Sequence, residues 1–188
     1  MILMILLMMQ VSQITVQAYD VPTWLGLNIA PNPIGVGQAV FINTLMTKPA
    51  PTASGFFGDH YKGITVEVTG PDGTKQTLGP FTADAAAGTY ASYMLTTTGN
   101  YIFQAFYPGQ TITGVNDNYP SSPGINLHMV GSKLLPAVSE KVILVVQEQP
   151  IPHYATALCQ PNTGPVQYMH STLTGATSLA ATGWDLLE

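Results

Sequence analysis

The stretch ITVEVTGPDGTKQTL (residues 64–78) alternates between apolar and polar side chains and is interrupted by a turn sequence. Apolar side chains recur at every second position from Ile64 to Val68, which is the period of a β-strand with one buried face. Pro71 presets the backbone for the turn, and Gly73 can adopt the positive φ that such a turn uses. The segment that follows resumes as a partner strand, so this stretch predicts a β-hairpin.

Five other segments have the β-branched and aromatic content of strands: residues 23–31, 38–47, 88–97, 99–109 and 138–150. No stretch from Tyr19 to Pro150 has a convincing helical period. About seven short strands separated by turns predict an all-β fold, an immunoglobulin-like β-sandwich.

Three connections between these strands are rich in turn-forming residues. Residues 31–37 hold two prolines and two glycines, so we expect a turn or an edge crossover there, without helix or strand pairing. Residues 48–63 and 110–137 are long segments rich in Pro, Gly, Ser and Asn, and they predict two long loops. Connections of that length inside a domain are usually functional or partly disordered.

Tyr101 stands at the start of the aromatic strand GNYIFQAFY. In immunoglobulin-like sandwiches a tyrosine near the start of the sixth strand bonds back to an upstream backbone group, in the tyrosine corner. Gly99 has the position that this corner favours, and Phe103 occupies the place where antibody domains have a cysteine. We therefore expect Tyr101 to be structural; a ligand-facing aromatic strip and an ordinary core tyrosine are the alternatives.

The composition excludes several classes of partner. Only 8% of the residues are charged and the net charge is −5, so the chain has no basic stripe for nucleic acid and no polybasic membrane patch. Cys159 is the single cysteine, which rules out a disulfide within the chain. A β-rich sequence with few charges, many threonines and many turn residues is typical of an extracellular or cell-surface protein.

Residues 1–18 begin with the apolar run MILMILLMM and end in Val-Gln-Ala. The run is shorter than the roughly 20 residues that span a bilayer, so we expect no stable membrane span. It fits the apolar part of a signal peptide with cleavage after Ala18, although the basic residues that usually precede that part are absent. A membrane-associated anchor and a true first strand remain alternatives.

The segments PNPIGVGQ, GPDGT with LGPF, and FYPGQTI carry a resemblance to a known family. From Trp24 to Tyr154 the chain resembles the immunoglobulin-like module of archaeal secreted or surface proteins, which often precedes a β-propeller of the pyrroloquinoline-quinone-like type. Residues 58–61 match an aromatic-containing Gly-Asp segment ahead of the third strand in that family. The resemblance implies a β-sandwich domain over residues 19–150.

Residues 151–188 depart from that family, because they match its Trp-rich linker only faintly. Four prolines among polar residues, from Pro150 to Pro165, predict an irregular linker, with a weak helix possible further on. This segment is a possible truncated start of a further domain, and no propeller activity can be transferred to it.

No catalytic or cofactor-binding residue can be assigned from the sequence, and no cofactor is expected. The histidines lack metal-ligand spacing, and Cys159 has no positioned base. Possible calcium ligands are the acidic loop residues Asp59, Asp72, Asp84 and Asp117. Asp117, with Asn116 and Asn118 beside it, is a weak calcium candidate, but turn formation is the simpler explanation of these three residues.

These observations favour a non-catalytic extracellular module that acts as a spacer, adhesion or interaction domain of an archaeal surface protein. Its partner would be another cell-surface protein, a polysaccharide or a further copy of the chain. The alternative is a structural subunit of an extracellular filament assembled by strand exchange. A third hypothesis is an enzyme whose catalytic part lies in a following propeller.

Overall fold

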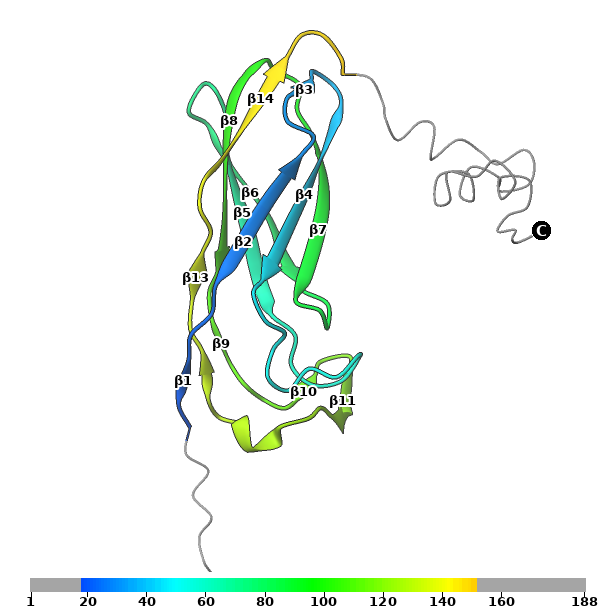
Figure 1. The fold of residues 1–188 in the computed structure, drawn as a ribbon, viewed down its shortest axis with the longest axis vertical. Helices are drawn as coiled ribbons and strands as arrows, with labels where there is room; N and C mark the ends of the chain where they lie inside the picture. Colours follow the sequence, from blue (N-terminus) through cyan, green and yellow to red (C-terminus); the bar gives the residue numbers. More distant parts are fainter. Residues whose placement is uncertain (1–17, 152–188) are drawn as a thin grey trace, which may run out of the picture. The chain divides into compact units, whose positions relative to one another are not determined.

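The computed structural model describes residues 18–151 of the chain, and these form a β-sandwich without α-helix (Figure 1). The expected signal peptide and the expected linker and tail lie outside the described residues, apart from Ala18 and Ile151. The chain divides into two units, Met1–Pro150 and Ile151–Glu188. Within the described part, no helix has the length and apolar character needed to cross a membrane.

Long strands form the two layers of the sandwich. They are β2 (Leu25–Ala30), β4 (Ala39–Met46), β5 (Lys62–Thr69), β6 (Lys75–Thr82), β7 (Gly88–Met94), β8 (Gly99–Tyr107) and β14 (Val142–Gln147). One sheet has the order β2-β4-β7, and the other has the order β3-β14-β8-β5-β6, where β3 is Ile34–Gly35. All pairings between the long strands are antiparallel. The predicted immunoglobulin-like sandwich of about seven strands is confirmed.

The core lies between the two sheets and follows from the alternation of the strands. Val40 and Ile42 point inward from β4, while Val66 and Phe103 point inward from the opposite sheet, and all four are almost fully buried in one cluster. Strands β4, β5 and β8 each bury every second side chain, so the buried set is continuous across the layers.

The predicted hairpin is present, with Val66 opposite Leu78 and Val68 opposite Gln76. The side chains of Ile64, Val66 and Val68 are buried, as their alternation indicated. The strand predicted over residues 38–47 is β4, the central strand of its sheet.

The prediction that residues 31–37 form no strand pairing is wrong. Ile34 and Gly35 form the short edge strand β3, which runs parallel to β14 with Ile34 opposite Val146. Both prolines precede these residues, at 31 and 33, so neither removes a donor from the pairing. Burial of the Ile34 side chain, which is 1% exposed, holds this edge against the core.

The second long connection is also more structured than its composition indicated. It contains β9 (Gln110–Thr111), β10 (Val115–Asn116), β11 (Tyr119–Pro123), the 3₁₀ turn η2 (Leu127–Met129), β12 (Lys133–Leu134) and β13 (Ala137–Val138). Its short strands pair mostly with one another, and β12 also pairs with the N-terminal strand β1 (Asp20–Val21).

The described chain begins and ends at opposite ends of the sandwich (Figure 1). Strand β1 lies beside β12 at the end that carries the long connections, whereas β14 ends beside β3 at the other end. The path of the chain therefore runs the full length of the two sheets.

Candidate functional site

Two long connections meet at one end of the sandwich, at the bottom of Figure 1. The first, residues 47–61, joins β4 to β5, and the second, residues 108–141, joins β8 to β14. The composition of these segments predicted two separate loops, and the structure brings them together.

Asp59 joins the two loops. Its side chain is fully buried, and its carboxylate accepts hydrogen bonds from the Thr52 hydroxyl at 2.7 Å, from the Thr113 hydroxyl at 2.8 Å and from the backbone N–H of Gly114 at 2.6 Å. The backbone N–H of Thr113 donates to the same carboxylate at 3.0 Å. Every donor in this set compensates for the lost hydration of a buried charge.

The two loops also approach through their backbones. The N–H of Ile125 donates to the Thr52 carbonyl at 3.0 Å, and the Asn126 amide donates to the Pro51 carbonyl at 2.8 Å. Gly124 lies so close to the first loop that a Cβ there would stand 1.9 Å from the Thr52 oxygen. Only glycine fits at this contact, which fixes the second loop against the first.

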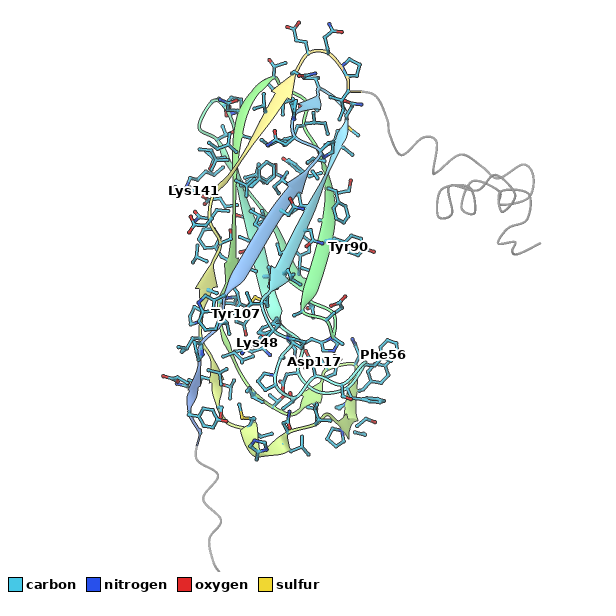
Figure 2. The ribbon with its side chains drawn as sticks, in the orientation of Figure 1. Lys48, Phe56, Tyr90, Tyr107, Asp117 and Lys141 are labelled. Atoms are coloured by element: carbon cyan, nitrogen blue, oxygen red, sulfur yellow. The ribbon has the colours of Figure 1, made fainter. Side chains whose placement is uncertain are left out.

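Three exposed aromatic side chains gather on the joined loops, and we name Phe56, Phe57 and Tyr119 the loop-end cluster. Phe57 meets Tyr119 edge to face at a ring-centroid distance of 5.7 Å, and Phe56 is 6.1 Å from Tyr119. Phe56 is 71% exposed and projects from the loop in Figure 2. Aromatic rings prefer the core, so an exposed group of three on anchored loops is typical of a binding surface.

The surroundings of this cluster carry few charges. Asp117 forms an ion pair with Lys62 at 2.6 Å, so two of the charges at this end neutralise one another. Three exposed aliphatic side chains, Ile125, Leu127 and Val130, follow Tyr119 on the second loop. The large exposed side chains of these two loop segments are therefore mostly apolar.

Two buried tyrosines support the base of the loops. Tyr61 and Tyr107 meet edge to face at 5.3 Å, and the Tyr61 hydroxyl donates to the Lys48 carbonyl at 3.0 Å. The Tyr107 hydroxyl is buried and has no hydrogen-bond partner in the described part of the chain. Burial raises the pKa of both phenols above the ordinary value, and for Tyr107 the nearby Tyr61 and Asp59 add to this effect.

The calcium candidates make contacts within the protein. The side-chain oxygen of Asn116 accepts a hydrogen bond from the backbone N–H of Asn118 at 2.9 Å, as in an Asx turn, and Asp117 pairs with Lys62. Among residues 18–151, no group of three or more His, Cys, Asp or Glu side chains could hold a metal ion.

Of the residues predicted to be structural, Tyr101, Gly99, Pro71 and Gly73 lie at the opposite end of the sandwich, and Phe103 lies in the middle of β8. The Tyr101 hydroxyl donates to the Thr97 carbonyl at 3.1 Å, and Phe103 is fully buried. Gly99 approaches Pro71 of the β5–β6 hairpin, whose turn includes Gly73. Their structural roles remain predictions.

Sequence reasoning missed the central residue of the site. It weighed Asp59 only as one of several acidic loop residues for calcium, whereas the carboxylate joins two loops. Asp59 directly follows a glycine in the segment Phe-Phe-Gly-Asp-His-Tyr, and nothing in that segment indicates its hydrogen-bond partner Thr113, 54 residues later.

Comparisons with known proteins give no family for this chain. No family model and no curated protein matches it. Among solved structures it is similar to a putative superoxide reductase from Thermotoga maritima, at 13% identity and a TM-score of 0.38, over 66% of this chain and 86% of that one.

Two domains of archaeal proteins are also similar. One is the CARDB domain of a Pyrococcus furiosus protein, an immunoglobulin-like domain, at 13% identity and a TM-score of 0.30, over 66% of this chain and 87% of that one. The other is the PKD domain of an M14-like peptidase from Thermoplasmatales archaeon SCGC AB-540-F20, at 12% identity and a TM-score of 0.29, over 66% and 94%. Scores this low carry no argument about function.

Proposed function

We propose that this chain is a non-catalytic spacer and interaction module of an extracellular protein, and that the loop-end cluster binds a protein partner. The observation that carries the proposal is the exposed aromatic cluster on two loops joined by the buried Asp59. Loops fixed in this way lose little conformational entropy on binding, so the cluster is pre-organised.

The composition of the surface favours a protein partner. Aromatic residues are enriched and charged residues depleted at the centre of protein interfaces. In the sequence, Phe56, Phe57 and Tyr119 are flanked by Ser, Gly and Asn residues, a combination that antibody binding loops use for protein targets. The partner would offer an apolar surface with backbone groups that these small polar residues can bond.

The course of the chain supports the spacer role. The described residues begin at the loop end and finish at the far end, so a segment that follows β14 would be held away from the loop-end cluster by the length of the sandwich. The binding surface stands at the end where the chain begins.

Selection of displayed peptides tests the binding surface. A random peptide library is selected on the wild-type protein, and the affinity of enriched peptides is measured for wild type, Phe56→Ala and Tyr90→Ala. Tyr90 is the matched control because it is 72% exposed, against 71% for Phe56, and lies on β7. We expect apolar peptides whose affinity falls about tenfold with Phe56→Ala and is unchanged with Tyr90→Ala. Peptides that bind both variants as well as wild type, or no enrichment at all, would overturn the proposal.

An extracellular, archaeal setting is supported by the sequence resemblance and by the signal-like residues 1–18. In the resembled family such a module stands ahead of a β-propeller, and we extend the same setting to this chain. Expression in a secreting archaeal host tests the location: the intact mass of the exported protein should correspond to Tyr19 as the first residue. Export with Met1 retained would favour the anchor or first-strand alternative for residues 1–18, and a protein that is not exported would contradict the location.

The filament alternative has less support. Strand exchange requires an unfilled position beside a core strand. Here β14 of the same chain occupies the position beside β8, in register from Val142 opposite Phe103 to Val146 opposite Gly99.

A further inference from the structure

The outer face of the sheet β2-β4-β7 is unusual for a sandwich surface. Antiparallel sheets commonly present polar side chains to solvent, yet the outward positions of this sheet include Phe41, Leu45, Tyr90 and Met94, all exposed. None of the three strands, Leu25–Ala30, Ala39–Met46 and Gly88–Met94, contains a charged residue. The outer face of the other sheet, by contrast, carries the Glu67–Lys75 ion pair.

Phe41 and Tyr90 form an aromatic platform on this face. Phe41 lies opposite Ser92 and Tyr90 lies opposite Asn43, so the two rings are diagonal neighbours on adjacent strands. Their centroids are 5.5 Å apart and their planes differ by 23°, a stacked arrangement. Figure 2 shows Tyr90 extending from β7 away from the core.

A row of uncharged polar groups crosses the sheet beside the platform. Asn28 lies opposite Asn43, and Asn43 lies opposite Tyr90, so two amides and a phenol stand in one line across β2, β4 and β7. Among the described residues, none of these three side chains has a hydrogen-bond partner. Each amide offers two donors and an acceptor, and the phenol offers one donor and an acceptor.

We propose that this face binds a neutral polysaccharide. The hydroxyl groups of the sugar would bond the Asn28 and Asn43 amides and the Tyr90 hydroxyl, and the C–H groups of its rings would pack on the Phe41–Tyr90 platform. The face lacks any charge that would attract an anionic polymer, so the ligand is uncharged. This site is separate from the loop-end cluster and adds a second ligand to the proposed function.

A second copy of the chain fits this face less well. Packing it against an identical face would bury the two amides and the phenol among Phe, Leu and Met side chains, and each polar group left without a partner costs about 1–3 kcal/mol. A polysaccharide presents hydroxyl groups along its whole length and can satisfy all three.

The test is retention of the full chain on insoluble cellulose and chitin and on immobilised mannan, with anionic alginate for comparison. We expect retention on at least one neutral polymer, about tenfold weaker with Tyr90→Ala and about fivefold weaker with Asn43→Leu. Phe56→Ala, with matched exposure on the other surface, should bind like wild type. Urea unfolding of each variant confirms that the fold is retained.

Asn43→Leu separates this proposal from self-association. The change removes an amide and enlarges the apolar area, so it weakens binding to a polysaccharide but strengthens contact between copies. A wild-type protein that binds none of the three neutral polymers overturns the proposal, as does a Tyr90→Ala variant that binds like wild type. A concentration-dependent dimer that Asn43→Leu stabilises would overturn it in favour of a second copy. None of these results depends on the peptide selection, so the two proposals fail separately.

Discussion

The carboxylate of Asp59 and the backbone N–H of Gly114 form a hydrogen bond of 2.6 Å across 55 residues of chain. Both groups are buried, at the point where the connection after β4 meets the connection after β8. The Asp59 side chain therefore helps to set the geometry of the end of the sandwich that carries the loop-end cluster, together with the backbone contacts at Thr52 and Pro51.

Asp59→Asn should destabilise the protein by about 2–4 kcal/mol. Both carboxylate oxygens accept hydrogen bonds, from Thr113 and from Gly114, so an amide NH₂ in place of either oxygen would face another donor. Equilibrium urea unfolding measures the loss. Binding of the selected peptides should weaken as well, because the loops would no longer be fixed.

Asp84→Asn is the matched control for that variant. Asp84 is exposed, and one oxygen accepts from the backbone N–H groups of Ala86 and Gly88 at 2.9 and 3.0 Å, which an asparagine oxygen can also do. We expect a change of less than about 1 kcal/mol. Equal losses for the two variants would contradict the assigned role of Asp59.

Local patterns predicted the sandwich because each of its strands has its own signal. The alternation from Ile64 to Val68 and the turn at Pro71 and Gly73 define a hairpin without reference to any distant residue. The short edge strand at Ile34 had no such signal, since its pairing with Val146 depends on a strand more than a hundred residues later.

The candidate site was predictable only as two long, turn-rich loops. Their contact depends on Asp59 meeting Thr113 and Gly114, and no periodic pattern encodes that meeting. The outer aromatic face was hidden for a related reason: Phe41 and Tyr90 belong to apolar segments that sequence reasoning treats as core, and only the sheet register shows that both point outward.

Tyr101→Phe should lower the free energy of unfolding by about 1 kcal/mol. The variant removes the hydroxyl that donates to the Thr97 carbonyl at 3.1 Å and leaves the ring in the core. Urea unfolding measures the change, and peptide binding at the other end should stay as in wild type. A variant as stable as wild type would contradict the assignment of Tyr101 to a tyrosine corner.

Tyr107→Phe should not lower the free energy of unfolding at neutral pH. We expect this free energy to stay the same or to rise by about 1 kcal/mol. The hydroxyl of Tyr107 is buried without a hydrogen-bond partner in the described residues, so its removal ends a desolvation cost. A clear loss of stability in the urea experiment would show that this hydroxyl has a partner, such as a buried water.

Alkaline pH gives a second measurement of Tyr107. Burial raises the pKa of Tyr107 above the ordinary 10.0, so the unfolded chain releases this proton at lower pH than the folded protein. The stability is therefore full below about pH 10 and falls as the pH rises further, with a slope approaching about 1.4 kcal/mol per pH unit for one such group. Tyr107→Phe should make the fall of the unfolding free energy with pH shallower by that amount, and a slope as steep as that of wild type would contradict the assignment to Tyr107.

Gly99→Ala and Gly73→Ala separate a steric conflict from backbone strain. Both glycines have positive φ, +131° and +84°, which an alanine adopts only with strain. A Cβ on Gly73 meets nothing within 4 Å, whereas a Cβ on Gly99 would lie 2.7 Å from Cβ of Pro71. We expect a loss of about 1–2 kcal/mol for Gly73→Ala, from strain alone, and about 1–3 kcal/mol more for Gly99→Ala, because Pro71 and its hairpin must shift. Thermal and urea unfolding of the two variants give the difference.

Equal losses of unfolding free energy for Gly73→Ala and Gly99→Ala would mean that the β5–β6 hairpin is free to move away from the start of β8. The contact between Gly99 and Pro71 would then not hold this end of the sandwich together.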